Sequence, residues 1–141
     1  MDTSQDFSLT HRVIGLAMEV HSQLGPGLLE SAYEECLCLE LARSAIDYRR
    51  QIPLPVTYKG LKLDLEYRMD IVVENRLIIE IKVVERILPV HKAQLLTYLR
   101  LSGYPTGLLM NFHTAMLKEG IHRVALSRQA SASPRLCVES A

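Results

Sequence analysis

An apolar segment with two opposite charges in its middle, residues 77–84, constrains this chain more than any other feature. A stretch that is apolar on both faces is typical of a central strand covered on both sides of a sheet. Glu80 and Lys82 lie two positions apart, so on a strand their side chains project from the same face. Because burying each ion costs several kcal/mol, we expect these groups to be paired, to bind a metal or to take part in chemistry. The alternative is a structural Glu–Lys ion pair or a half-exposed edge of the sheet.

The segments around this strand predict a single α/β domain with a mixed sheet. Apolar residues that recur every three or four positions predict helices, and alternating or continuous apolar runs predict strands. Two prolines in residues 49–58 confine that segment to a sheet edge. The predicted order is helix 8–24, helix 28–44, edge strand 49–58, strand 62–73, strand 77–84, helix 89–101, strand 106–112 and strand 121–126. We therefore expect one domain over residues 1–126 and, because periodicity stops there, a flexible tail over residues 127–141.

Asp70 lies on the strand before the charged one, on the polar side of its alternating pattern. A three-residue loop between the two strands would pair Val73 with Leu77, and therefore Asp70 with Glu80. Two adjacent carboxylates raise each other's pKa unless a cation lies between them. A divalent metal that prefers oxygen ligands removes this repulsion, and magnesium is the ion we predict. The alternative is that Asp70 only continues the polar stripe of its strand.

Charge and cysteine content limit the classes of function. Sixteen basic and sixteen acidic residues give a net charge of zero, which excludes a histone-like mode of binding but allows a local basic groove. The polar, acidic N-terminus is unlike a signal peptide, and no apolar run approaches the roughly 18 residues of a membrane span, so we expect no membrane partner. Three cysteines without zinc-ligand spacing predict free thiols in a reducing compartment, the cytoplasm.

Asp70, followed after nine residues by Glu80, Ile81 and Lys82, resembles the D-(x)n-E-x-K core of the PD-(D/E)XK nuclease superfamily. The wider sequence resembles the GxxExxY proteins, a family placed in that superfamily. The matching segments, in the family's order, are residues 20–21, 24–27, 27–33, 68–70, 80–82, 94–99 and 111–112. The resemblance covers about residues 9–126, and Met69 stands where the superfamily pattern has a proline.

The resemblance implies a restriction-endonuclease-like αβββαβ core, with a mixed central sheet flanked by helices and a metal site on its two central strands. By this resemblance Asp70 and Glu80 are metal ligands, helped by the carbonyl of Ile81. Glu30 would add a third carboxylate from the preceding helix, and Lys82 would orient or activate the attacking water. Outside the resemblance, Glu30 is better explained as a solvated helix carboxylate.

Gln94 and Tyr98, one helical turn apart, match a Q-x-x-x-Y element that some superfamily nucleases place near the substrate backbone. Without the resemblance, Tyr98 is explained as an ordinary core aromatic. Phosphates would be held without sequence readout by nearby cations, unless these are only solvated surface. The cations are Lys59, Lys62, Arg68, Arg86 and Lys92.

The function predicted is a metal-dependent nuclease that hydrolyses phosphodiester bonds. Its cofactor would be Mg²⁺, with Mn²⁺ able to substitute, and its partner nucleic acid, with DNA favoured over RNA. The alternative is a nucleic-acid-binding or assembly module that keeps the nuclease fold without turnover. Intact Asp70, Glu80 and Lys82 favour the nuclease, because a non-catalytic module has little reason to keep costly buried charges. A homodimer or a partner subunit remains open.

Overall fold

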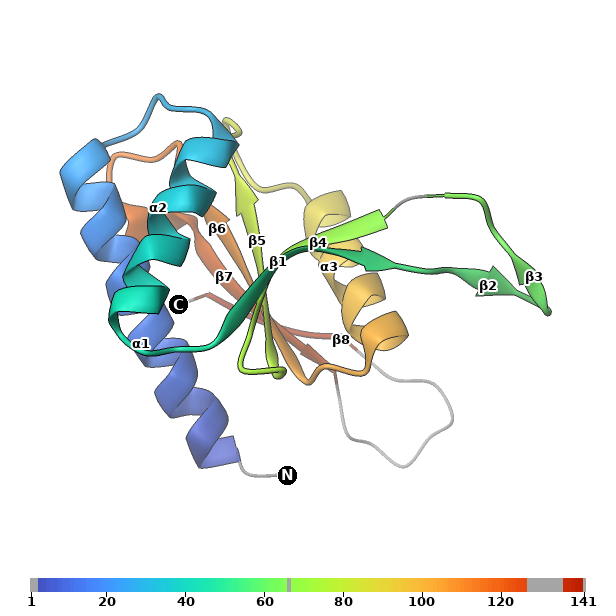
Figure 1. The fold of residues 1–141 in the computed structure, drawn as a ribbon. Coiled ribbons are helices and arrows are strands. Elements are labelled where there is room, and N and C mark those ends of the chain that lie inside the picture. Colours follow the sequence, from blue (N-terminus) through green and yellow to red (C-terminus); the bar gives the residue numbers. More distant parts are fainter. Residues whose placement is uncertain (1–2, 66, 127–135, 141) are drawn as a thin grey trace.

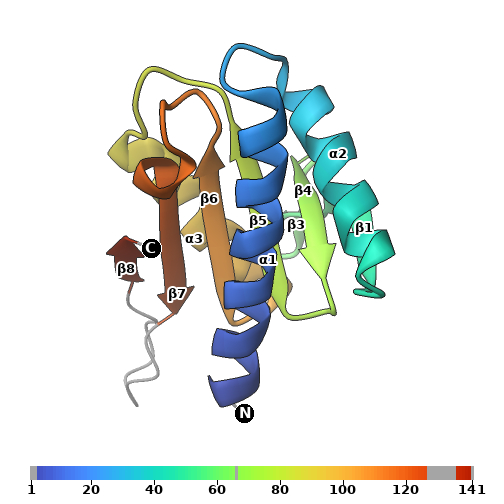
Figure 2. The same cartoon turned by 90° about the vertical axis from the view of Figure 1, so that its left-hand side faces the viewer.

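The computed structural model describes residues 3–65, 67–126 and 136–140 and shows a mixed sheet between two helical layers (Figure 1). Helices α1 (Thr3–Leu24) and α2 (Glu30–Arg43) cover one face, and α3 (Pro89–Ser102) covers the other. Figure 2 shows α1 lying across the sheet in front of β5 and β6. Pro89 at the first turn of α3 fits the fixed φ of proline, and Gly103 ends this helix in the left-handed conformation (φ 83°).

The main sheet has the strand order β1-β4-β5-β6-β7-β8. β5 and β6 run parallel and are joined through α3, whereas the other neighbouring pairs run antiparallel. The bounds are β1 (Tyr48–Leu54), β4 (Tyr67–Val73), β5 (Leu77–Lys82), β6 (Thr106–Asn111), β7 (Ile121–Leu126) and β8 (Leu136–Ser140). Strands β2 (Thr57–Tyr58) and β3 (Leu61–Lys62) form a separate two-stranded sheet, and a 3₁₀ helix, η1 (Leu117–Gly120), precedes β7. The predicted α/β class with a mixed sheet flanked by helices is confirmed.

Two apolar cores lie on opposite faces of the sheet, and β5 contributes to both. Leu77, Ile79 and Ile81 pack in the core under α1 and α2. Ile78 packs on the other face against Leu95 of α3. The sequence prediction of a central strand buried on both sides is therefore confirmed for β5.

The turn between β4 and β5 has the predicted three-residue loop. Val73 pairs with Leu77, and the ladder continues to Ile71 opposite Ile79. Glu74 and Asn75 in the loop have positive φ angles of 53° and 54°. This register directs Asp70 and Glu80 toward each other, as the sequence predicted.

The single strand predicted over residues 62–73 is wrong in two respects. Its first part belongs to the β2–β3 hairpin, and residue 66 lies outside the described residues. Its alternation also fails at Asp70, since Met69 packs in the core on the α3 side whereas Ile71 packs under α1 and α2. The β1–β4 pairing is interrupted at the same point: Gln51 lies between the residues that pair with Ile71 and Met69, and it has a left-handed backbone (φ 50°).

The end of the chain also differs from the expected tail over residues 127–141. Residues 136–140 form β8, which runs antiparallel to β7 and extends the sheet. The open edge of β7 offers backbone groups for such pairing, and a five-residue strand is too short for its periodicity to mark it in the sequence. Residues 127–135 and 141 lie outside the described residues.

Candidate active site

The β4–β5 ladder stops at Ile71 and Ile79, although both strands continue beyond that pair. β4 continues along β1, and β5 continues along β6, so the two strands separate. At this fork the Asp70 backbone N–H donates to Glu80 Oε2 (2.9 Å). The Ile81 backbone N–H in turn donates to Asp70 Oδ2 (2.9 Å). Each carboxylate thus accepts a hydrogen bond from the opposite strand, and we call Asp70, Glu80 and Ile81 the β4–β5 fork.

Burial dominates the electrostatics of the two carboxylates. Glu80 is only 5% exposed, and desolvation followed by the charge of Asp70 raises the pKa of Glu80 to about 8. Desolvation also raises the pKa of Asp70 to about 6, against the opposing hydrogen bond from Ile81. The second oxygens, Asp70 Oδ1 and Glu80 Oε1, accept no hydrogen bond from any residue that the structure describes. The fork therefore presents two oxygen donors whose negative charge is poorly compensated.

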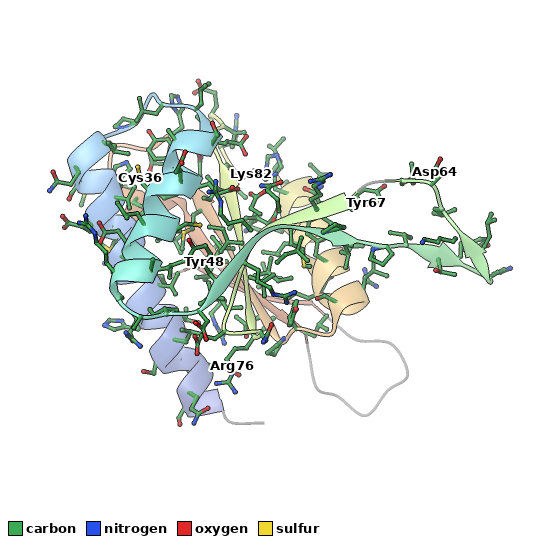
Figure 3. All side chains as sticks on the ribbon, viewed as in Figure 1. Cys36, Tyr48, Asp64, Tyr67, Arg76 and Lys82 are labelled. Atoms are coloured by element: carbon green, nitrogen blue, oxygen red, sulfur yellow. The ribbon has the colours of Figure 1, made fainter. Side chains whose placement is uncertain are left out.

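Lys82 lies at the end of β5, half-buried, and its charge lowers the pKa of both fork carboxylates. Figure 3 shows Lys82 at the same end of the sheet as Tyr67, whereas Arg76 lies at the opposite end. Phe112 N donates to the Lys82 carbonyl (2.9 Å). Lys82 forms no ion pair with a carboxylate in the described ranges. The described residues therefore do not show the structural Glu80–Lys82 ion pair that was the alternative interpretation of the sequence.

Glu30 stands in the first turn of α2 and is exposed. Its charge raises the pKa of both Asp70 and Glu80, so it lies within electrostatic reach of the fork. Within the described residues, however, no three His, Cys, Asp or Glu side chains are grouped closely enough to hold a metal ion. The structure thus brings Asp70 and Glu80 together and leaves Glu30 beside them, and the ligand role of Glu30 stays a prediction.

Gln94 and Tyr98 of α3 border the same region. Gln94 Nε2 donates to the Tyr98 hydroxyl (3.0 Å). Burial, followed by the charges of Glu80 and Asp70, raises the pKa of Tyr98 to about 12. Both residues line a cavity of about 270 Å³, which Tyr67 also lines. Tyr98 thus lies within electrostatic reach of the carboxylates, and Gln94 is hydrogen-bonded to it. The role of both residues at the site stays a prediction.

Glu34 is a buried carboxylate that the sequence did not single out. It is one turn after Glu30 on α2, and its Oε2 accepts from Arg50 Nη2 (2.9 Å) and Nε (3.1 Å). Its Oε1 accepts from Gln51 Nε2 (2.8 Å). The charge of Glu34 raises the pKa of Asp70. The four-residue spacing from Glu30 marks a shared helical face, but nothing in the sequence pairs Glu34 with the distant Arg50.

Arg50→Met is expected to destabilise the fold by about 2 kcal/mol, because it leaves the Glu34 carboxylate buried without its cation. The measurement is urea unfolding at neutral pH, with Arg12→Met, at an exposed position, as the matched control. Adding Glu34→Gln to the Arg50 variant should recover part of the loss, since it removes the unpaired charge. A double variant as unstable as the sum of the single changes would show that the pair is not coupled.

The donor chemistry of the fork fits a divalent cation that prefers oxygen. Magnesium takes one or two protein carboxylates and completes its coordination shell with water and substrate phosphate. Asp70 and Glu80 supply two such carboxylates, each with an oxygen that is free of the hydrogen bonds above. A third protein ligand is not needed for this type of site.

Comparison with known proteins agrees with the fold and the fork. The family model of the PD-(D/E)XK nuclease superfamily matches residues 7–124. No curated protein sequence and no solved structure matches the chain at a significant level. Within the described segments, no helix combines the length and the apolar character needed to cross a membrane. Because the family model covers most of the chain and the sheet has the predicted restriction-endonuclease-like form, this chain belongs to the PD-(D/E)XK nuclease superfamily, whose members are generally nucleases.

Proposed function

We propose that this protein is a metal-dependent nuclease and that the β4–β5 fork is its catalytic centre. The superfamily supports nuclease-type chemistry on nucleic acid. The observation that carries the assignment to the fork is the pair of buried carboxylates, Asp70 and Glu80, which lie side by side and whose pKa values are raised above all by burial. Such perturbed carboxylates are typical of functional sites.

Asp70, Glu80 and the carbonyl of Ile81 would hold Mg²⁺, or Mn²⁺ in its place, with Glu30 as an additional carboxylate. A bound divalent cation supplies a more acidic water and offsets charge on the leaving oxygen of a phosphodiester. Lys82 places a positive charge beside the fork, where it orients the attacking water and stabilises negative charge that develops on the phosphate. Gln94 and Tyr98 would contact the substrate backbone from α3.

Within the superfamily we assign the chain to the GxxExxY proteins, on Gly27, Glu30 and Tyr33. The Tyr33 hydroxyl donates to the Gly25 carbonyl (2.6 Å) and accepts from Leu28 N (3.1 Å). The Tyr33 ring is fully buried, and its side chain therefore ties the α1–α2 loop to the first turn of α2. That turn carries Glu30, so the motif tyrosine supports the position of the motif glutamate.

A nucleic-acid-binding or assembly module without turnover is the second candidate, and one observation favours it. The described residues hold two fork carboxylates and no group of three metal-binding side chains.

DNA is our preferred substrate over RNA. A cytoplasmic location is our inference from Cys36 and Cys38, which are both free thiols.

The proposal is tested by incubating the purified protein with single-stranded and double-stranded DNA and RNA in Mg²⁺, in Mn²⁺ and in chelator. We expect cleavage in either metal, none in chelator, and none by Glu80→Gln. Unchanged cleavage by folded Glu80→Gln would remove the fork from the chemistry. Absence of cleavage on all four substrates by the folded wild-type protein would favour the binding module.

Lys82→Met is expected to lower cleavage by about 10²-fold, because it removes the positive charge next to the reacting phosphate. Stability at pH 8 in chelator should fall by less than about 1 kcal/mol, since Lys82 is a half-exposed residue and forms no ion pair within the described chain. Turnover and urea unfolding are measured beside Lys118→Met, at an exposed position on η1. A loss of about 3 kcal/mol with little change in turnover would instead make Lys82 a structural partner of Glu80.

A further inference from the structure

Residues 55–65 form an arm that projects from the main sheet, away from α1 and α2 (Figure 1). The arm joins β1 to β4, the strand that carries Asp70. Within it β2 and β3 pair with each other, and Leu63 N donates to the Val56 carbonyl (2.9 Å). Lys59 and Gly60 form its two-residue turn with positive φ angles of 48° and 83°, as a tight hairpin requires. The arm is therefore a regular β-hairpin with paired strands and a tight turn.

The arm exposes large apolar side chains together with cations. Tyr58 is 60% exposed, Leu61 63% and Leu65 53%. The Lys59 ammonium lies 5.4 Å from the centre of the Tyr58 ring. Lys62 is also exposed. A two-stranded hairpin gains little stability by itself, so this exposure is better explained by contact with another molecule than by folding.

Two neighbouring pockets lead from the arm to α3. A cavity of about 370 Å³ at the base of the arm is lined by Lys62, Leu65 and Tyr67, with Asp64 as its acidic member. Tyr67 also lines the cavity of about 270 Å³ that contains Tyr98. Figure 3 shows Tyr67 where the arm meets the sheet and Asp64 further out along it. The two cavities therefore share one aromatic residue and lead from the arm to α3.

Tyrosines are concentrated along this line. The chain has six tyrosines, and three of them, Tyr58, Tyr67 and Tyr98, lie on the arm or in the adjoining cavity. The Tyr67 and Tyr98 rings are 6.4 Å apart in an edge arrangement. Tyr98 is close enough to the fork for the charges of Glu80 and Asp70 to act on its hydroxyl. Tyrosine side chains thus lie on the arm, at its base and within electrostatic reach of the fork.

We propose that the arm and the two cavities at its base bind single-stranded nucleic acid, so that the substrate is unpaired next to the fork. Unpaired bases expose flat faces that stack on tyrosine, while lysines beside the rings hold the phosphates. Bases inside a duplex are already stacked on their neighbours, so a duplex offers these rings no equivalent contact. This inference rests on the proposed function, because the phosphodiester has to reach Asp70 and Glu80.

Nucleic acid fits the arm better than a protein partner does. The arm, residues 55–65, carries two basic residues, Lys59 and Lys62, and one acidic residue, Asp64. This excess of positive charge favours an anionic ligand. The Lys59 ammonium lies over the exposed Tyr58 ring, and the line of tyrosines leads toward a site whose superfamily acts on nucleic acid. The competing occupant is a second copy of this chain, docked through Leu61 and Leu65. The test below distinguishes such self-association from nucleic-acid binding.

The test is fluorescence anisotropy with short labelled single-stranded DNA, single-stranded RNA and DNA duplex, in chelator so that the strands stay intact. We expect wild-type protein to bind at least one single strand about tenfold more tightly than the duplex. Tyr58→Ala should weaken that binding by about tenfold. Lys62→Ala should lower the slope of log K against log salt by about 0.7, as for loss of one phosphate contact on a single strand.

Met116→Ala and Lys118→Ala are the matched controls, since both positions are exposed near η1. Unchanged affinity in Tyr58→Ala, or duplex binding as tight as single-strand binding, would overturn the inference. So would a dimer in sedimentation that Leu61→Ser dissociates, because the arm would then serve self-association. Single-strand binding through Tyr58 without cleavage in Mg²⁺ or Mn²⁺ would keep the inference and reject the nuclease. Cleavage that needs Glu80 but prefers duplex would reject the inference alone.

Discussion

Asp70→Asn is expected to abolish metal-dependent cleavage and, in chelator at pH 8, to melt at a higher temperature than the wild-type protein. Cleavage should fall by about 10²-fold or more, because even residues that only support metal ligands cost about 10- to 100-fold when changed. Stability should rise because the change removes one of two charges that repel each other in a buried site. The asparagine oxygen can still accept the hydrogen bond from Ile81 N. We expect a melting temperature about 3 °C higher or more.

Asp47→Asn is the matched control, because it removes the same charge at an exposed position near the opposite end of the sheet. It should change neither cleavage nor melting. An Asp70→Asn variant that melts several degrees lower than wild type in chelator would make Asp70 a structural partner. The binding-module function would then be preferred.

In chelator, the free energy of unfolding is expected to fall as the pH rises from about 5 to about 8. The carboxyl pKa values are about 3.9 for Asp and 4.3 for Glu in an unfolded chain, and folding raises them to about 6 for Asp70 and about 8 for Glu80. The folded state therefore binds more protons than the unfolded state across this window, so stability decreases with pH. The stabilisation is complete below about pH 4 and is lost by about pH 8. The expected loss is on the order of 3 kcal/mol.

Urea unfolding at several pH values measures this dependence, and two comparisons assign it to the fork. Asp70→Asn combined with Glu80→Gln should flatten the profile, whereas Asp47→Asn should leave it unchanged. Mg²⁺ should stabilise the wild-type protein more at pH 8 than at pH 5, because a cation binds the ionised carboxylates. Stability that rises between pH 5 and pH 8 in chelator would contradict the raised pKa values of the pair.

The sequence predicted the central strand and the register beside it for physical reasons that are local. β5 has apolar residues at consecutive positions, and only a strand covered on both faces accommodates them. The loop of residues 74–76 fixed the pairing of Val73 with Leu77, and pairing by a constant sum brought Asp70 to Glu80. These features depend on neighbouring residues, so they are readable from one chain.

The sequence could not predict features that depend on distant segments. The change of face at Asp70 coincides with a left-handed backbone at Gln51 on another strand, a conformation that glutamine does not signal. The burial of Glu34 depends on Arg50, sixteen positions away. Most of the arm was assigned to two longer strands, because residues such as Tyr58 and Leu63 have strand-like character whether or not they join the main sheet.

Calorimetric titration of Mn²⁺ into metal-free wild-type protein and into Asp70→Asn, at pH 7 in two buffers of different ionisation enthalpy, tests the fork as a metal centre most directly. The wild-type protein should bind the ion and release protons to the buffer, because the carboxyl pKa of Glu80, about 8, leaves that group largely protonated before binding. Asp70→Asn should bind at least about tenfold more weakly. Equal binding by the two proteins, or no binding by the wild-type protein, would contradict the assignment of Asp70 and Glu80 as metal ligands.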